Sequence, residues 1–86
     1  MYRILTENKN RERIEELLEA MTEGFTIFTA QGYWKGESVY YREDSLAIEL
    51  VNVPYALAAT IAQRIKIIND QEAVLILTIP ATAEFI

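Results

Sequence analysis

The sequence predicts a small α+β domain in which four strands and two helices follow the order βαββαβ. Two stretches repeat apolar residues at the three- and four-residue spacing of a helix, and four others are rich in β-branched and aromatic residues. The composition, 51% hydrophobic and 24% charged, is that of a folded globular protein. Because 86 residues leave room for one hydrophobic core, we expect a single domain over residues 1–86.

The first half of the chain predicts a strand, a helix and a second strand. Tyr2–Leu5 is a short apolar strand. A helix then begins near Asn10, and its apolar face consists of Ile14, Leu17, Leu18 and Met21. Gly24 is expected to end this helix in the left-handed conformation. Phe25–Thr29 starts the second strand, with an extension through Trp34 left open.

The second half predicts a turn, a third strand, a helix and a last strand. Lys35-Gly36 is a turn candidate, and Ser38–Tyr41 is extended in character. Arg42–Ser45 is polar, so the next strand is expected to begin at Leu46, from where residues of the two strand faces alternate. Asn52 is the expected cap of the second helix, with Pro54 in its first turn. The apolar stripe of this second helix consists of Leu57, Ile61, Ile65 and Ile68, and Asn69-Asp70 ends the helix. The last strand is expected over Ala73–Ile79.

This order, with two β-α-β crossovers joined by a hairpin, predicts a ferredoxin-like sandwich. Both helices are expected on one face of an antiparallel sheet, with a long hairpin between the second and third strands. The last strand is apolar on both faces, which predicts a second cover over the sheet. We expect a homo-oligomer, a dimer or trimer, to provide it. The alternative is that Phe85 and Ile86 fold back over that face.

Composition excludes several classes of function. The chain has no cysteine and no histidine, which removes disulfides, thiolate sites and the usual acid/base residue, so we expect no enzyme and no cofactor. A net charge of -5 disfavours nucleic-acid binding. The N-terminus resembles no signal peptide and no apolar run is long enough for a membrane, so we expect a cytoplasmic protein.

The segment Gln31–Arg42 concentrates aromatic and charged residues and is the predicted binding site. In this hypothesis Trp34 stacks on a ring, Lys35 and Arg42 contact a small anionic ligand such as a nucleotide, and Tyr33 braces the loop. The alternative is that Tyr33 and Trp34 are cross-strand packing pairs or anchors between subunits.

Two groups of carboxylates are weaker candidates. Glu72 with Glu43 or Asp44 could form an acid/base pair or a hard-cation site, although acidic residues at strand entries are usually solvated. The first helix carries acidic residues at four-residue spacing, which favours a solvated outer face over a docking surface for a basic partner.

Four segments resemble an uncharacterised bacterial and phage protein family: Gly24-Phe25-Thr26, Gln31–Gly36, Glu43–Glu49 and Asn69–Leu75. That family is similar in architecture to the nitrogen-regulatory PII signalling proteins. The resemblance implies ferredoxin-like subunits, often trimeric, with a long loop between the second and third strands. The chain lacks recognisable PII nucleotide-binding signatures, so the resemblance implies a fold and an assembly and adds little about function.

The leading hypothesis is therefore a non-enzymatic, homo-oligomeric, PII-like module that captures a small anionic ligand. The rival hypothesis is a protein-interaction module whose aromatic residues and acidic helix contact another protein, which would be a host factor if the gene is phage-encoded.

Overall fold

The computed structural model describes all residues from 1 to 86 and contains two helices and four strands. The elements are β1 (Tyr2–Glu7), α1 (Arg11–Met21), β2 (Thr26–Lys35), β3 (Tyr40–Leu50), α2 (Tyr55–Ile68) and β4 (Leu75–Thr78). The predicted α+β class and the predicted order of helices and strands are confirmed.

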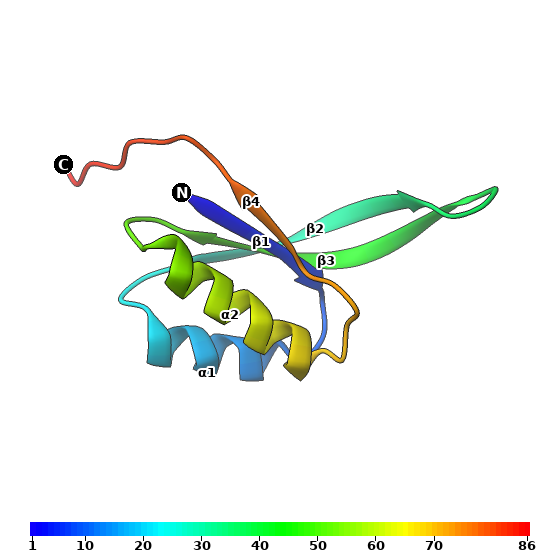
Figure 1. The fold of residues 1–86 in the computed structure, drawn as a ribbon, viewed down its shortest axis with the longest axis horizontal. Coiled ribbons are helices and arrows are strands. Elements are labelled where there is room, and N and C mark those ends of the chain that lie inside the picture. Colours follow the sequence, from blue (N-terminus) through cyan, green and yellow to red (C-terminus); the bar gives the residue numbers. More distant parts are fainter.

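The four strands form one sheet in the order β2-β3-β1-β4, and every neighbouring pair is antiparallel. Both helices lie on the same side of this sheet, and its other side is left open (Figure 1). The β2–β3 hairpin extends well beyond the helices, away from the C-terminal segment (Figure 1). Neither helix has the length and hydrophobicity that crossing a lipid bilayer requires.

The core lies between the helices and the covered face of the sheet. The predicted helical stripes point into it: Ile14 and Leu18 of α1 are fully buried, as are Ile61 and Ile65 of α2. The strands contribute alternate residues, as expected of a sheet covered on one face. The fully buried strand side chains are Ile4, Leu46, Ile48 and Leu50.

The predicted end of α1 at Gly24 is wrong. The helix ends at Met21, and Thr22 follows in an extended conformation. Both the amide and the hydroxyl of Thr22 donate to the Leu18 carbonyl, at 2.9 and 3.0 Å. This side-chain bond satisfies the last turn of the helix without a left-handed glycine, and no glycine in the chain has a positive φ.

The predicted start of α2 is also wrong in detail. Asn52 lies in the left-handed region, with φ 56°, and its side chain caps no helix amide. Pro54 is the cap residue instead, just outside the helix, and its carbonyl accepts hydrogen bonds from the amides of Leu57 and Ala58. Asn69 does end this helix, as predicted.

The third strand begins at Tyr40, six residues before the predicted start at Leu46. Arg42–Ser45 is polar, but each of these residues pairs directly with a residue of β2. Alternation fails as a signal over residues 42–44 because the hairpin has left the helices there, so polar residues suit both of its faces. Ser45 differs, because it is only 7% exposed and also pairs with Glu7 of β1.

Candidate functional site

The distal part of the β2–β3 hairpin contains all four predicted site residues. Tyr33 pairs with Arg42, and Lys35 pairs with Tyr40. Directly paired residues share a face, and residues two apart along a strand do so as well. Tyr33, Lys35, Tyr40 and Arg42 therefore form one exposed surface, which we call the cationic face.

The two cations of this face are free of ion pairs. The three salt bridges of the chain involve Arg3, Lys9 and Arg11. Lys35 and Arg42 thus keep their full hydrogen-bonding capacity beside two phenol rings. The cationic face combines unpaired positive charge with aromatic surface, which is the chemistry that recognises a small anion bearing a ring.

Trp34 lies on the opposite face of the hairpin. It pairs with Tyr41 across the two strands, one residue out of phase with the cationic face. The indole folds back over Gly32, and its Nε1 donates to Glu43 Oε2 at 3.0 Å. A Cβ atom on residue 32 would lie 2.9 Å from that nitrogen, so this arrangement requires glycine.

A second glycine makes room for a second aromatic ring near the turn. A Cβ atom on Gly36 would lie 2.6 Å from Cε2 of Tyr41. The Gly36 amide also donates to the Val39 carbonyl at 2.8 Å, which closes the turn. The two glycines of the segment Gly32-Tyr33-Trp34-Lys35-Gly36 are thus explained by two aromatic rings, of Trp34 and Tyr41, that occupy the space where a Cβ atom would lie.

The structure brings three of the four predicted site residues together and separates the fourth. Tyr33, Lys35 and Arg42 share the cationic face, whereas Trp34 points the other way. The prediction grouped residues by nearness in the sequence; the alternation of side chains along a strand places Trp34 on the other face. Tyr40 was named among the aromatic residues of the segment but was not selected for the site.

Trp34 and Glu43 line a hollow of about 660 Å³ between the hairpin, the end of β1 and the chain that enters β4. Four of its lining residues are carboxylates and none is basic: Glu7, Glu43, Asp70 and Glu72. We call it the acidic hollow. Its charge repels an anionic ligand, which separates it chemically from the cationic face.

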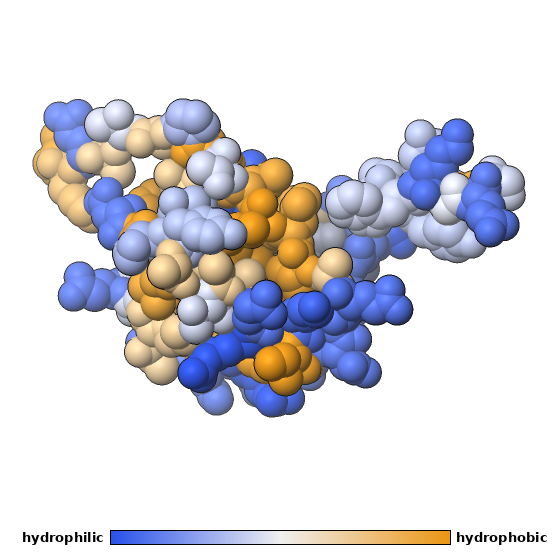
Figure 2. Space-filling model, in the orientation of Figure 1, coloured by the Kyte–Doolittle hydropathy of each residue, from blue (hydrophilic) through white to orange (hydrophobic).

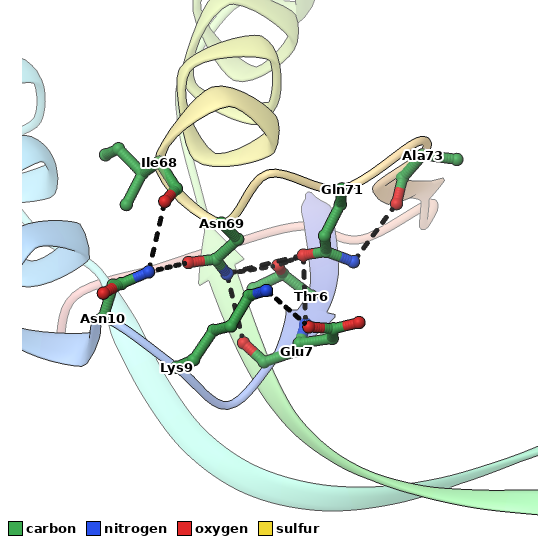
Figure 3. Close-up of polar contacts among 8 residues, drawn as sticks. All are labelled: Thr6, Glu7, Lys9, Asn10, Ile68, Asn69, Gln71 and Ala73. Carbon is green, nitrogen blue, oxygen red and sulfur yellow. Dashed lines mark hydrogen bonds and ion pairs between the residues drawn. The ribbon is translucent and has the colours of Figure 1, made fainter.

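A buried polar network supports one side of the acidic hollow (Figure 3). Asn69 is only 1% exposed, and its Nδ2 donates to Thr6 Oγ1 at 2.9 Å and to the Glu7 carbonyl at 3.2 Å. Gln71 accepts hydrogen bonds from the Thr6 hydroxyl and the Glu7 amide. Asn10 donates to Asn69 Oδ1 and to the Ile68 carbonyl. The network joins β1, the start of α1 and the end of α2.

The carboxylates named as weaker candidates are only partly brought together. Glu43 and Glu72 line the acidic hollow, but Asp44 lies on the other face of β3, near Asn8 and Gln31. It shares that face with Arg42 and therefore borders the cationic face. No group of three or more carboxylates is placed to hold a metal ion.

The uncovered side of the sheet is a second candidate surface. Phe28, Ala47, Leu5 and Leu75 form one row across all four strands. Phe28 and Leu75 remain 41% and 42% exposed. In the next row Arg3 bonds Glu49 at 2.5 Å beside Leu77. We call this surface the open face. The prediction that the last strand is apolar on both faces is confirmed, because Leu75 and Leu77 lie on the open face while Val74 and Ile76 pack against the core.

Comparison with known proteins identifies the fold and no activity. Neither a family model nor a curated protein matches the sequence. A solved structure of a DUF3240 family protein from Shewanella baltica OS155 is similar, with a TM-score of 0.61 and 15% identity. The similarity covers 98% of this chain and 92% of that one. At this identity the likeness concerns the fold, and the neighbour belongs to a family of unknown function.

Proposed function

We propose that the protein is a non-enzymatic, homo-oligomeric module of ferredoxin-like, PII-like architecture that binds a small anionic ligand on its hairpin. The element order and the strand order β2-β3-β1-β4 support the architecture. The observation that carries the proposal is the open face, an apolar row across four strands on a sheet that helices cover on one side only.

The energetics of burial favour assembly through the open face. Covering a large apolar side chain contributes about 2 kcal/mol when its full area leaves water. Phe28 and Leu75 each retain about two fifths of their exposure, and Leu5, Leu77 and Ile79 are half-buried. A second copy that presents the same surface would cover all five in a dimer, and in a trimer the two neighbouring copies would cover them.

The cationic face is the proposed ligand site. Lys35 and Arg42 neutralise the charge of the ligand, and Tyr33 and Tyr40 stack against its ring. Trp34 contributes to this site only through the shape of the hairpin, because its ring lies over Gly32 on the other face.

A calorimetric screen of nucleotides against the intact protein tests the ligand site. Arg42→Ala is expected to lower the affinity of a nucleotide about tenfold or more, because it removes a charged partner. Arg64→Ala, which removes an exposed cation from α2, is the matched control and should leave the affinity unchanged. Loss of binding in the Trp34→Ala variant with full binding in Arg42→Ala would contradict the assignment of the cationic face.

Light scattering on a substituted open face tests the assembly. Phe28→Glu places a charge at the β2 end of the apolar row and should reduce the particle mass. Ile67→Glu is the matched control, since Ile67 is 77% exposed on α2 and away from the open face. An unchanged mass in Phe28→Glu would show that the copies meet elsewhere.

A protein-interaction module is the second candidate, and the acidic hollow favours it. A lysine or arginine side chain of a partner would find an indole and four carboxylates there. Retention of a partner from lysate that is lost in a Glu43→Lys variant, together with silence toward nucleotides, would support this candidate over the first.

A further inference from the structure

The outer edge of β4 presents unpaired backbone groups. β4 is the last strand of the sheet and pairs only with β1. The N-terminal ammonium group of Met1 donates to the Ile79 carbonyl at 3.0 Å, and the Ile79 amide donates to the Met1 carbonyl at 2.8 Å. Inward-facing and outward-facing pairs alternate in an antiparallel ladder, so the N–H and C=O groups of Ile76 and Thr78 point away from β1, as do those of Val74 at the entry to the strand.

This edge has none of the features that normally block strand pairing. The segment Ala73–Ile79 contains no charge, no proline and no glycine, and it is bounded by Glu72 and Pro80. Exposed edges of monomeric proteins usually carry a lysine, a proline or a bulge. Figure 2 shows a hydrophobic patch in the region where Figure 1 places β4, between the hairpin and the C-terminal segment.

The helix beside β4 leaves this edge accessible. A shallow groove of about 220 Å³ runs between α2 and the strand, and Tyr55, Ala59, Ala62, Gln63 and Lys66 line its helical side. Ala59 and Ala62 lie there opposite Val74 and Ile76. The two alanines have no atoms beyond Cβ to cover the part of the strand beside them, so another strand can approach the free hydrogen-bonding groups of Val74 and Ile76 there.

We propose that β4 pairs in antiparallel orientation with β4 of a second copy, about a two-fold axis at Ile76. This register uses the outward groups of both chains: Ile76 meets Ile76 of the second copy, and Val74 meets Thr78 of the second copy. It forms about six backbone hydrogen bonds. The two four-stranded sheets become one continuous sheet with a continuous open face.

The charges on and beside β4 favour a second copy as the occupant. In this register Glu72 lies opposite Pro80 of the second copy, so no like charges meet across the pair. An uncharged strand meets an uncharged strand, and the two-fold axis closes the contact after one partner. The open edge of β2 would instead pair head to tail with β4 and generate a ring or an open chain of subunits.

The edge contact is independent of the open face and goes beyond the proposed function. In a closed particle of dihedral symmetry, pairing of β4 edges doubles the number of copies that the open face assembles. A variant with a disrupted open face should therefore form a particle of twice the 9.9 kDa chain mass. A variant with a disrupted edge should halve the mass of the unmodified protein.

Light scattering on Thr78→Pro tests the pairing. Proline removes the outward amide of an exposed residue and costs no bond to β1, so the subunit should keep its fold. Thr78→Val is the control, because it keeps the amide and the β-branched shape. We expect half the particle mass for Thr78→Pro and an unchanged mass for Thr78→Val. An unchanged mass for the proline variant overturns the proposal.

Amide hydrogen exchange on the unmodified protein gives a second measurement that does not depend on any variant. The Ile76 amide should exchange at least tenfold more slowly than in a Thr78→Pro, Phe28→Glu double variant, which lacks both contacts. Fast exchange at Ile76 in the unmodified assembly overturns the pairing even if the open face assembles. A particle mass that grows steadily with concentration indicates head-to-tail pairing and overturns it as well.

Discussion

The indole Nε1 of Trp34 donates to the Glu43 carboxylate at 3.0 Å, across a position that only glycine can occupy. Glu43 is the direct cross-strand partner of Gly32. The indole of Trp34 therefore crosses over Gly32, which has no side chain, to reach the Glu43 carboxylate. This contact fixes the ring toward the acidic hollow and away from the cationic face. Trp34 is the only tryptophan of the chain, which makes its position measurable by fluorescence.

Gly32→Ala is expected to displace the indole. The added Cβ would lie 2.9 Å from Nε1, so the ring must move and the bond to Glu43 must lengthen or break. We expect a shift of the tryptophan emission maximum to longer wavelength and faster quenching by acrylamide, with a loss of stability of about 1 kcal/mol.

Gly24→Ala is the matched control for this substitution. No atom lies within 4 Å of a Cβ on residue 24, and its φ is not positive. Emission and quenching should stay unchanged there, and the stability should change by less than about 0.5 kcal/mol. An equal spectral effect of the two alanine substitutions would contradict the contact between Gly32 and Trp34.

Asn69→Ala should destabilise the protein by about 1–3 kcal/mol, because it leaves the buried Thr6 hydroxyl and Glu7 carbonyl short of a donor. Chemical denaturation measures this loss. Asn8→Ala, at an exposed position without a side-chain hydrogen bond, should cost less than about 0.5 kcal/mol. A similar loss for both variants would mean that the network in Figure 3 adds no stability of its own.

The Arg3–Glu49 ion pair reports on whether the open face is covered. Its side chains are 33% and 23% exposed in the single chain, where breaking the pair should cost less than about 1 kcal/mol. If a second copy covers it, Glu49→Gln leaves an uncompensated charge and should cost about 3 kcal/mol or more. Denaturation at high protein concentration distinguishes the two values.

Glu15→Gln is the control for that ion pair. Arg11–Glu15 lies on the exposed surface of α1, at 2.8 Å, and its loss should cost about 0.5 kcal/mol at any concentration. Equal losses for Glu49→Gln and Glu15→Gln would indicate that Arg3 and Glu49 remain in solvent.

The sequence was most informative where burial produces a period. The stripes of Ile14 with Leu18 and of Ile61 with Ile65 predicted two helices and the faces that they bury, because one side of each helix meets the core. The same reasoning predicted that the last strand is apolar on both faces, and the structure packs Val74 and Ile76 against the core.

The sequence was least informative where local chemistry decides the conformation. Thr22 ends α1 with a side-chain hydrogen bond. The helix end was wrongly predicted at Gly24, two residues later, because glycine is the usual residue at a helix end. Arg42–Ser45 was excluded from a strand because it is polar, although over residues 42–44 the hairpin has left the helices and polar residues suit both of its faces. The alternation that separates Trp34 from Arg42 follows from the register of the hairpin, which the sequence left unset because the turn was placed too early.

Multi-angle light scattering over a dilution series of the unmodified protein tests the central claim most directly. The apolar row on the open face predicts a defined particle whose mass is an integral multiple of 9.9 kDa and at least twice that value. A monodisperse particle of 9.9 kDa at millimolar concentration would contradict the assembly.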